Sequence, residues 1–305
     1  MLYFTGLLSK LACLAFGLCG GEPSAFQPVI APAPVTADHV AEYRFGVEPM
    51  SVTRNLWRRY NPLIREINWA AAGYQIRLES GLTAHTYDRK LIDGVFDFVL
   101  VEPHRVLQAE RLNYFVFARA GRKDRISGVI VVRSDAQIRT VRDLRGKTIS
   151  FGARTALAST LMPRMWLREA NFSERRAELL FTGSDETALF RVWRGLAVAA
   201  AVSRSGWERF LEDNPEAQAS MQVRWRTNEL SGPAVMAHRR VPAGHIELIA
   251  AVLTNLDLTQ TGRKALIAAG LKSLQPGNDS SYDDVWEFLT SYARVFGYRA
   301  PGVLP

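Results

Sequence analysis

The stretch SFGARTALASTLMPR, residues 150–164, places hydroxyl and guanidinium groups where a strand pattern runs into a helix pattern. A strand, a short loop and a helix in this order present backbone N–H groups and the positive end of the helix dipole to an anion. Arg154 adds a fork of donors, and Thr155, Ser159 and Thr160 add hydroxyls. These residues predict an anion site. The alternative is that Arg154 faces solvent while the apolar residues of the stretch pack the helix.

A second polar group, Glu102, His104 and Arg105, follows the apolar run FDFVLV. The carboxyl ends of strands are where open α/β sheets bind ligands. Glu102 is expected to accept a hydrogen bond from an amine or hydroxyl of a ligand, and Arg105 to pair with an anion. Alternatively, the segment is an ordinary strand-to-helix turn with Arg105 in solvent.

Patterns for other chemistries are incomplete. Gly146-Lys-Thr matches the end of a phosphate-binding loop, but Val141 stands where that loop needs a glycine, and a strand pattern follows. SRSG at 203–206 is not a G-x-S-x-G nucleophile turn. The five histidines lack metal-ligand spacing, and no nucleophile can be matched with a base. We therefore expect no enzymatic activity, no metal site and no cofactor.

The amino-terminal residues differ from the rest of the chain. Residues 1–21 carry one charge, Lys10, and an apolar stretch that ends in small residues, which is typical of a secretory signal. A lipidated or uncleaved anchor, with Cys19 as the lipidated residue, and a cytoplasmic chain are the alternatives. Residues 22–42 are rich in Pro and Ala and predict a linker. Both cysteines lie in the first segment, so the remainder has no thiol for a disulfide, a nucleophile or a metal.

The composition is that of a folded, basic protein. The 305 residues are 48% hydrophobic and 22% charged, with a formal net charge of +8, and the length suffices for two α/β lobes. A basic balance suits nucleic acid, anionic lipid or a small anion. The arginines are scattered, and the dense cluster RAGRKDR, residues 119–125, lies in a predicted loop. We therefore expect a solvated basic surface and no nucleic acid partner.

Strand and helix patterns alternate from residue 43 onward, in two successive series that end in three helices. Each series predicts a parallel sheet covered by helices. The predicted strands are 43–49, 74–80, 96–103, 114–120, 127–135, 147–153, 177–183, 196–203, 222–228 and 232–242. The predicted helices are 53–72, 86–93, 104–111, 139–146, 159–170, 185–195, 206–213, 243–257, 259–269 and 281–296. Pro62 is expected to kink the first helix or to start a second one.

The segment SGVIVVRSDAQIRTVRDLRGKTISFG resembles periplasmic substrate-binding proteins of phosphonate- and phosphite-type ABC importers. FGVEP, YNPLIREI, LIDGVFDFVLVEP and FTGSDETALFRVWRG support this resemblance, which extends from about Tyr43 to Tyr298. It implies a type II periplasmic binding protein fold, in which two α/β lobes, each with a mainly parallel sheet, close on a ligand about a hinge. The implied boundaries are 43–126 plus 231–298 for lobe 1, 127–230 for lobe 2 and 299–305 for a tail.

Several ligand contacts of the family are absent from this chain. The family pattern F-x-D-P-x-S-T-S-G falls on residues 151–159 and puts Ala, Leu and Ala at its three hydroxyl positions, 156–158. The family's histidine falls on Asp185, while a family aromatic is kept near Tyr87, which is either a cleft aromatic or a core aromatic of its helix. Each donor lost to a buried charge costs about 1.5–3 kcal/mol. The pattern therefore argues against a phosphonate and leaves room for another anion, such as a carboxylate.

The resemblance predicts a periplasmic solute-binding protein, secreted or anchored through its first residues, that captures a small anion between its lobes for an ABC permease. The alternative is a binding-protein fold whose cleft has degenerated and which now contacts a membrane sensor. We expect a monomer. The predicted ligand-binding residues are Tyr87, Glu102, His104, Arg105, Arg154, Thr155, Ser159, Thr160 and Asp185.

Overall fold

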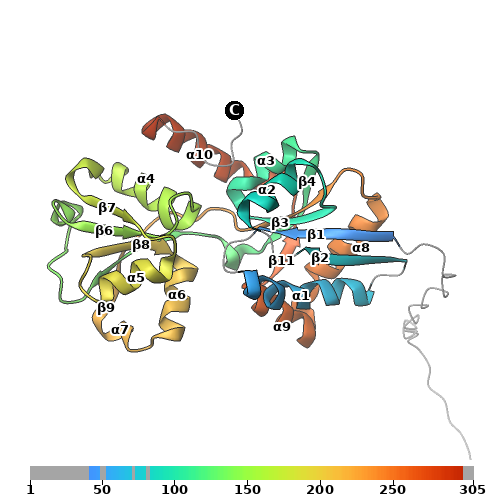
Figure 1. The fold of residues 1–305 in the computed structure, drawn as a ribbon, viewed down its shortest axis with the longest axis horizontal. Helices are drawn as coiled ribbons and strands as arrows, with labels where there is room; N and C mark the ends of the chain where they lie inside the picture. Colours follow the sequence, from blue (N-terminus) through green and yellow to red (C-terminus); the bar gives the residue numbers. More distant parts are fainter. Residues whose placement is uncertain (1–40, 49–52, 71–72, 80–82, 298–305) are drawn as a thin grey trace, which may run out of the picture. The chain divides into compact units, whose positions relative to one another are not determined.

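The computed structural model describes residues 41–48, 53–70, 73–79 and 83–297 (Figure 1). The predicted signal segment, nearly all of the predicted linker and the carboxyl-terminal tail lie outside these residues. Within the described part of the chain, no helix combines the length and the apolar character needed to cross a membrane.

Six strands form the sheet of lobe 1, in the order β11-β4-β10-β3-β1-β2. The strands are β1 (Ala41–Val47), β2 (Tyr74–Glu79), β3 (Phe98–Val101), β4 (Tyr114–Ala120), β10 (Ala234–His238) and β11 (Leu274–Pro276). Strand β1 pairs in parallel with both β2 and β3, as helical connections predict. The pairs of β10 with β3 and β4, and of β11 with β4, are antiparallel. Strand β11 has no counterpart among the predicted strands.

Five strands form the sheet of lobe 2, in the order β7-β6-β8-β5-β9. They are β5 (Gly128–Arg133), β6 (Thr148–Phe151), β7 (Glu178–Phe181), β8 (Ala199–Ser203) and β9 (Met221–Arg226). Strand β6 is parallel to β7 and β8, whereas β5 is antiparallel to β8 and β9. Both sheets are therefore mixed: most strands of each sheet run in one direction, as predicted, while β10 and β11 in lobe 1 and β5 in lobe 2 run against them. The chain passes between the lobes without an α-helix, so β5 and β10 enter their sheets in the opposite direction.

Helices flank both sheets (Figure 1). Lobe 1 carries α1 (Thr53–Ala70), α2 (Ala84–Ile92), α3 (Val106–Arg111), α8 (Ala243–Thr254), α9 (Gln260–Ala269) and α10 (Asp283–Phe296). Lobe 2 carries α4 (Met162–Glu169), α5 (Asp185–Trp193), α6 (Arg204–Asp213) and α7 (Ala217–Ser220). Helix α1 continues through Pro62, so no second helix starts there. The helix predicted at 139–146 is only a 3-10 turn, Val141–Leu144.

The two crossings between the lobes run side by side. Ile126 and Leu230 form an antiparallel bridge in which each N–H donates to the other residue's carbonyl at 2.9 Å. Beside this bridge, Arg125 donates to the carboxylate of Asp284 at 2.8 Å, and the N–H of Ser231 donates to the same oxygen at 2.9 Å. Helix α10 is thereby fastened to both crossings.

Apolar side chains on the two faces of each sheet form separate cores. Along β3, Phe98 and Leu100 belong to one core of lobe 1, and Val99 and Val101 belong to the other. Leu157, at the middle of the three positions where the family has hydroxyls, is buried in the second of these cores. The fold thus uses this residue for packing.

Candidate functional site

Two glutamates end neighbouring strands in lobe 1. The tripeptide Val-Glu-Pro occurs at 47–49 and again at 101–103, so that Glu48 follows β1 and Glu102 follows β3. Because these two strands are adjacent and parallel, the repeat brings the two residues together at one edge of the sheet. The N–H of Glu102 donates to Oε2 of Glu48 at 3.3 Å. Glu48 was not among the predicted site residues, although the repeated tripeptide was a signal for it.

Glu102 is a half-buried carboxyl group with a strongly shifted pKa. Burial raises this pKa to about 8, the negative charge of Glu48 adds to the rise, and Arg59 opposes it. Glu102 is therefore mainly protonated at neutral pH. A protonated carboxyl can donate a hydrogen bond as well as accept one, so Glu102 can face an oxyanion without repelling it.

Arg105 is engaged inside lobe 1. Its Nε donates to Oε1 of Glu48 at 2.9 Å, and its two terminal nitrogens donate to Asp88 at 2.7 Å and to Gln108 at 2.9 Å. The side chains of Arg105 and Glu48 are only 13% and 14% exposed. Arg105 is thus not the solvated side chain of the alternative prediction. Its geometry makes it the group that positions Glu48.

Tyr87 and His104 are buried close to the same glutamates. Among the described residues, the Tyr87 hydroxyl and Nδ1 of His104 have no hydrogen-bond partner. Burial raises the pKa of Tyr87 and lowers that of His104, and the charge of Glu48 adds to the first shift and opposes the second. His104 is therefore neutral at pH 7. The Tyr87 ring stacks on Phe96, with ring centres 5.3 Å apart, which places it in the core of lobe 1.

Asp185 is held within lobe 2, in the first turn of α5. Its Oδ2 accepts from the N–H of Ser203 at 3.0 Å and from the Ser203 hydroxyl at 2.6 Å. Burial raises the pKa of Asp185, while hydrogen bonds from Ser203 and Ser159 oppose this rise. A Cβ atom at Gly152 or Gly206 would collide with this carboxylate, so both glycines leave the room it needs. The side chains of Asp185 and Ser159 are therefore hydrogen-bonded to each other inside lobe 2.

Arg154 lies on the loop after β6. Its guanidinium carbon is 4.0 Å from the centre of the Phe181 ring, and the side chain is otherwise exposed. Within the described part of the chain, no hydrogen bond or ion pair joins Arg154 to another side chain. Thr155 beside it is also exposed, whereas the Thr160 hydroxyl is buried and donates to the carbonyl of Ala153 at 2.8 Å. Of the predicted polar groups in this stretch, Arg154 and Thr155 remain available to a ligand.

The charge of Arg209 in α6 affects titratable groups of both lobes, and this residue was not predicted. Burial raises the pKa of Tyr60 in α1, and Arg59 and Arg209 oppose this rise. Arg209 also opposes the raised pKa of Asp185 in lobe 2. Charge effects of this kind weaken with distance and are screened by salt, so Arg209 is near enough to affect one titratable group in each lobe. A single exposed arginine on a helix carries no signal in the sequence.

The arrangement can bind a small polar solute through hydrogen bonds and charge. Lobe 1 contributes the neutral acid Glu102, and lobe 2 contributes the exposed guanidinium of Arg154. The described residues hold no group of three His, Cys, Asp or Glu side chains placed for a metal ion.

A protein-family model described as "ABC transporter, phosphonate, periplasmic substrate-binding protein" matches residues 45–282, which include strands of both sheets. The chain belongs to this family. Members of the family are substrate-binding proteins, and the family is periplasmic, in agreement with the resemblance seen in the sequence.

Two curated relatives match about half of the chain. The protein named "Probable ABC transporter phosphite binding protein PhnD1" of Prochlorococcus marinus is 24% identical over 170 residues, which cover 51% of this chain and 57% of the relative. The tetrathionate sensor histidine kinase TtrS of Salmonella typhimurium is 28% identical over 159 residues, which cover 49% of this chain and 26% of the kinase. The chain thus spans about half of the first relative's length and a quarter of the second's.

Among solved structures, PhnD1 of Prochlorococcus marinus in complex with methylphosphonate superposes with a TM-score of 0.69 at 19% identity. The superposition covers 85% of this chain and 99% of that one. A likeness at this identity shows the fold, which is the type II periplasmic binding protein fold with two helix-flanked sheets.

Proposed function

We propose that the chain is an extracytoplasmic solute-binding protein that captures a small anion between its lobes and presents it to an ABC permease. Membership of the substrate-binding family supports solute capture. An anion is favoured because the guanidinium of Arg154 stacks on the ring of Phe181 at the carboxyl end of the lobe 2 sheet. Stacking on a ring preorganises a guanidinium and leaves its planar N–H edge to bind an oxyanion.

Glu102 supplies a complementary group from lobe 1. With a pKa of about 8, it donates its O–H to an oxyanion at neutral pH and becomes a repelling charge above that value. Below pH 8 the site therefore favours an oxyanion that accepts from both Arg154 and Glu102. Because residues 156–158 offer no hydroxyls, we propose a carboxylate in preference to a phosphonate.

Thermal unfolding of the purified protein with a panel of anions tests the proposal. The panel contains phosphite, methylphosphonate, phosphate, and mono- and dicarboxylates, and a bound solute raises the melting temperature by mass action. Arg154→Ala is expected to weaken binding by about tenfold or more. Arg145→Ala, which removes an exposed arginine before β6 and so at the other end of that strand, should leave affinity unchanged. Absence of any response, or equal binding by the Arg154 variant, would contradict an anion site.

A second candidate is a solute-sensing domain of a membrane signalling system. The match to part of a sensor histidine kinase favours it, as does the packing of Leu157 where the family has a hydroxyl. In that case the partner is a membrane sensor instead of a permease. A gene neighbourhood with a permease and an ATPase supports transport, whereas a neighbouring histidine kinase supports sensing.

A further inference from the structure

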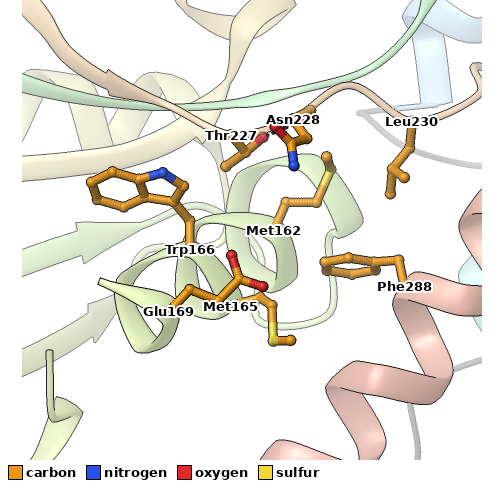
Figure 2. A pocket seen from close by; sticks show the side chains of 8 residues that line it. All are labelled: Met162, Met165, Trp166, Glu169, Thr227, Asn228, Leu230 and Phe288. Carbon is orange, nitrogen blue, oxygen red and sulfur yellow. Dashed lines mark hydrogen bonds between the residues drawn. The ribbon is translucent and has the colours of Figure 1, made fainter. Parts of the chain in front are cut away.

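A pocket of about 120 Å³ lies next to the interlobe crossings and shares no residue with the candidate site (Figure 2). Its walls come from three segments that are distant in the sequence: α4 of lobe 2, the crossing that leads from β9 to β10, and α10. We call it the crossing pocket. Any group bound there touches elements on both sides of the crossings.

The walls of the crossing pocket are apolar and polarisable. Met162, Met165 and Trp166 line it from α4, while Leu230 and Phe288 line it from the crossing and from α10. Thioether and aromatic groups make a soft surface that adapts to a ring or a short alkyl chain. Its volume is comparable to that of cavities that accept a single benzene ring, so the occupant is small.

Two polar groups face the crossing pocket from opposite sides. Figure 2 shows the carboxylate of Glu169 and the amide of Asn228 directed toward the same space. In the part of the chain that the structure describes, neither side chain has a hydrogen-bond or ion-pair partner. Arg164, on the same helix as Glu169, donates instead to Glu174 at 2.6 Å and to the Tyr292 hydroxyl at 2.7 Å. Glu169 is exposed at the rim of the pocket, so its charge is solvated and can pair with an incoming group.

We propose that the crossing pocket binds a small arylalkyl ammonium ion, with its ring against Met162 and Phe288 and its ammonium group at Glu169. A cation gains both from a carboxylate and from nearby aromatic faces, whereas an anion is repelled at the same position. Because the walls belong to both lobes, the bound ion stabilises the lobe arrangement that it contacts. The proposal does not depend on which solute the strand ends bind.

Isothermal titration with benzylammonium chloride tests this site on the intact protein. Binding is expected to saturate at one ion per chain, with millimolar affinity because the ligand is small. Benzyl alcohol, which has the ring without the charge, should bind about tenfold more weakly or worse. Because Glu169 is exposed, Glu169→Gln should weaken binding of the ammonium ion by about threefold and leave binding of benzyl alcohol unchanged. Met165 is half-buried, and Met165→Trp should fill the pocket and abolish binding of both the ammonium ion and benzyl alcohol.

Glu212→Gln provides the matched control, because it removes an exposed carboxylate from α6 and should not alter the titration. Melting temperatures of the variants without ligand establish that each one is folded. Lack of saturable binding, or binding unaffected by Met165→Trp, would overturn the site. If Glu169→Gln binds the ammonium ion as tightly as the unmodified protein does, the ammonium class is wrong.

Discussion

Replacing Glu102 by Gln should make the protein more stable at alkaline pH and change little in acid. The pKa of Glu102 is raised by burial and by the charge of Glu48, so the folded state holds a proton that the unfolded state releases at lower pH. Between the ordinary pKa of 4.5 and about 8, the folded state therefore binds more protons than the unfolded state. In this window the free energy of unfolding falls as pH rises. Above pH 8 the protein bears the full cost of holding Glu102 ionised in the folded state. Gln keeps the shape of the protonated acid and cannot ionise.

The size of this effect follows from the shift itself. A pKa that rises from 4.5 to about 8 differs by about 3.5 pH units, and each unit corresponds to about 1.4 kcal/mol, which gives an upper limit of about 5 kcal/mol. The side chain is only half-buried, so water and side-chain relaxation stabilise the charged form in part. We expect Glu102→Gln to raise the free energy of unfolding by about 2 kcal/mol at pH 9.

Urea unfolding at a series of pH values between 4 and 9 measures this difference directly. The free energies of unfolding of the two proteins should coincide near pH 4 and differ progressively more up to about pH 8. Glu247→Gln, which removes an exposed carboxylate of α8, controls for the loss of one acidic group. A separation that is independent of pH, or one that grows toward acid, would show that Glu102 is ionised in the folded protein at neutral pH.

Three further predictions concern contacts of Arg105, Gly206 and Phe181. Arg105→Met leaves Glu48 without its main partner and should lower the free energy of unfolding by about 3 kcal/mol in urea, while the double variant with Glu48→Gln should recover part of this loss. Gly206→Ala should destabilise the protein by about 1–3 kcal/mol because the new Cβ meets Asp185. Gly244 lies in the first turn of α8 with open space around it, so Gly244→Ala should stabilise the protein by up to about 1 kcal/mol. Calorimetry that finds the same sign for both variants would contradict this packing. Phe181→Leu removes the ring under Arg154 and should weaken anion binding, but severalfold less than Arg154→Ala does. Titration of both variants with the same anion compares the two losses of affinity.

Most strands and helices were predictable because their patterns are local. Alternation along β2 and the helical spacing of α1 depend on neighbouring residues in the chain, and the structure has both elements within two residues of the predicted ends. The direction of β5 and β10 was not predictable in this way. Whether a strand pairs in parallel depends on the route the chain takes into the sheet, and that route is set by contacts between residues far apart in the sequence.

The candidate site was predictable in part. The sequence placed Glu102 and Arg154 after buried strands, and both lie at strand ends in the structure. It could not reveal that Arg105 forms an ion pair with Glu48, because the two residues are 57 positions apart in the sequence. The ligand roles of these residues remain predictions that the binding experiments address.

The sequence by itself determined the family, the alternation of strands and helices, and the loss of the family's hydroxyls at 156–158. These properties are written in residue types at short spacing. Only the tertiary structure decided which charges are left for a ligand. A guanidinium or carboxylate is available when no nearby group in space has already paired with it, and for Arg105, Arg154 and Glu169 that depends on how the chain folds back on itself.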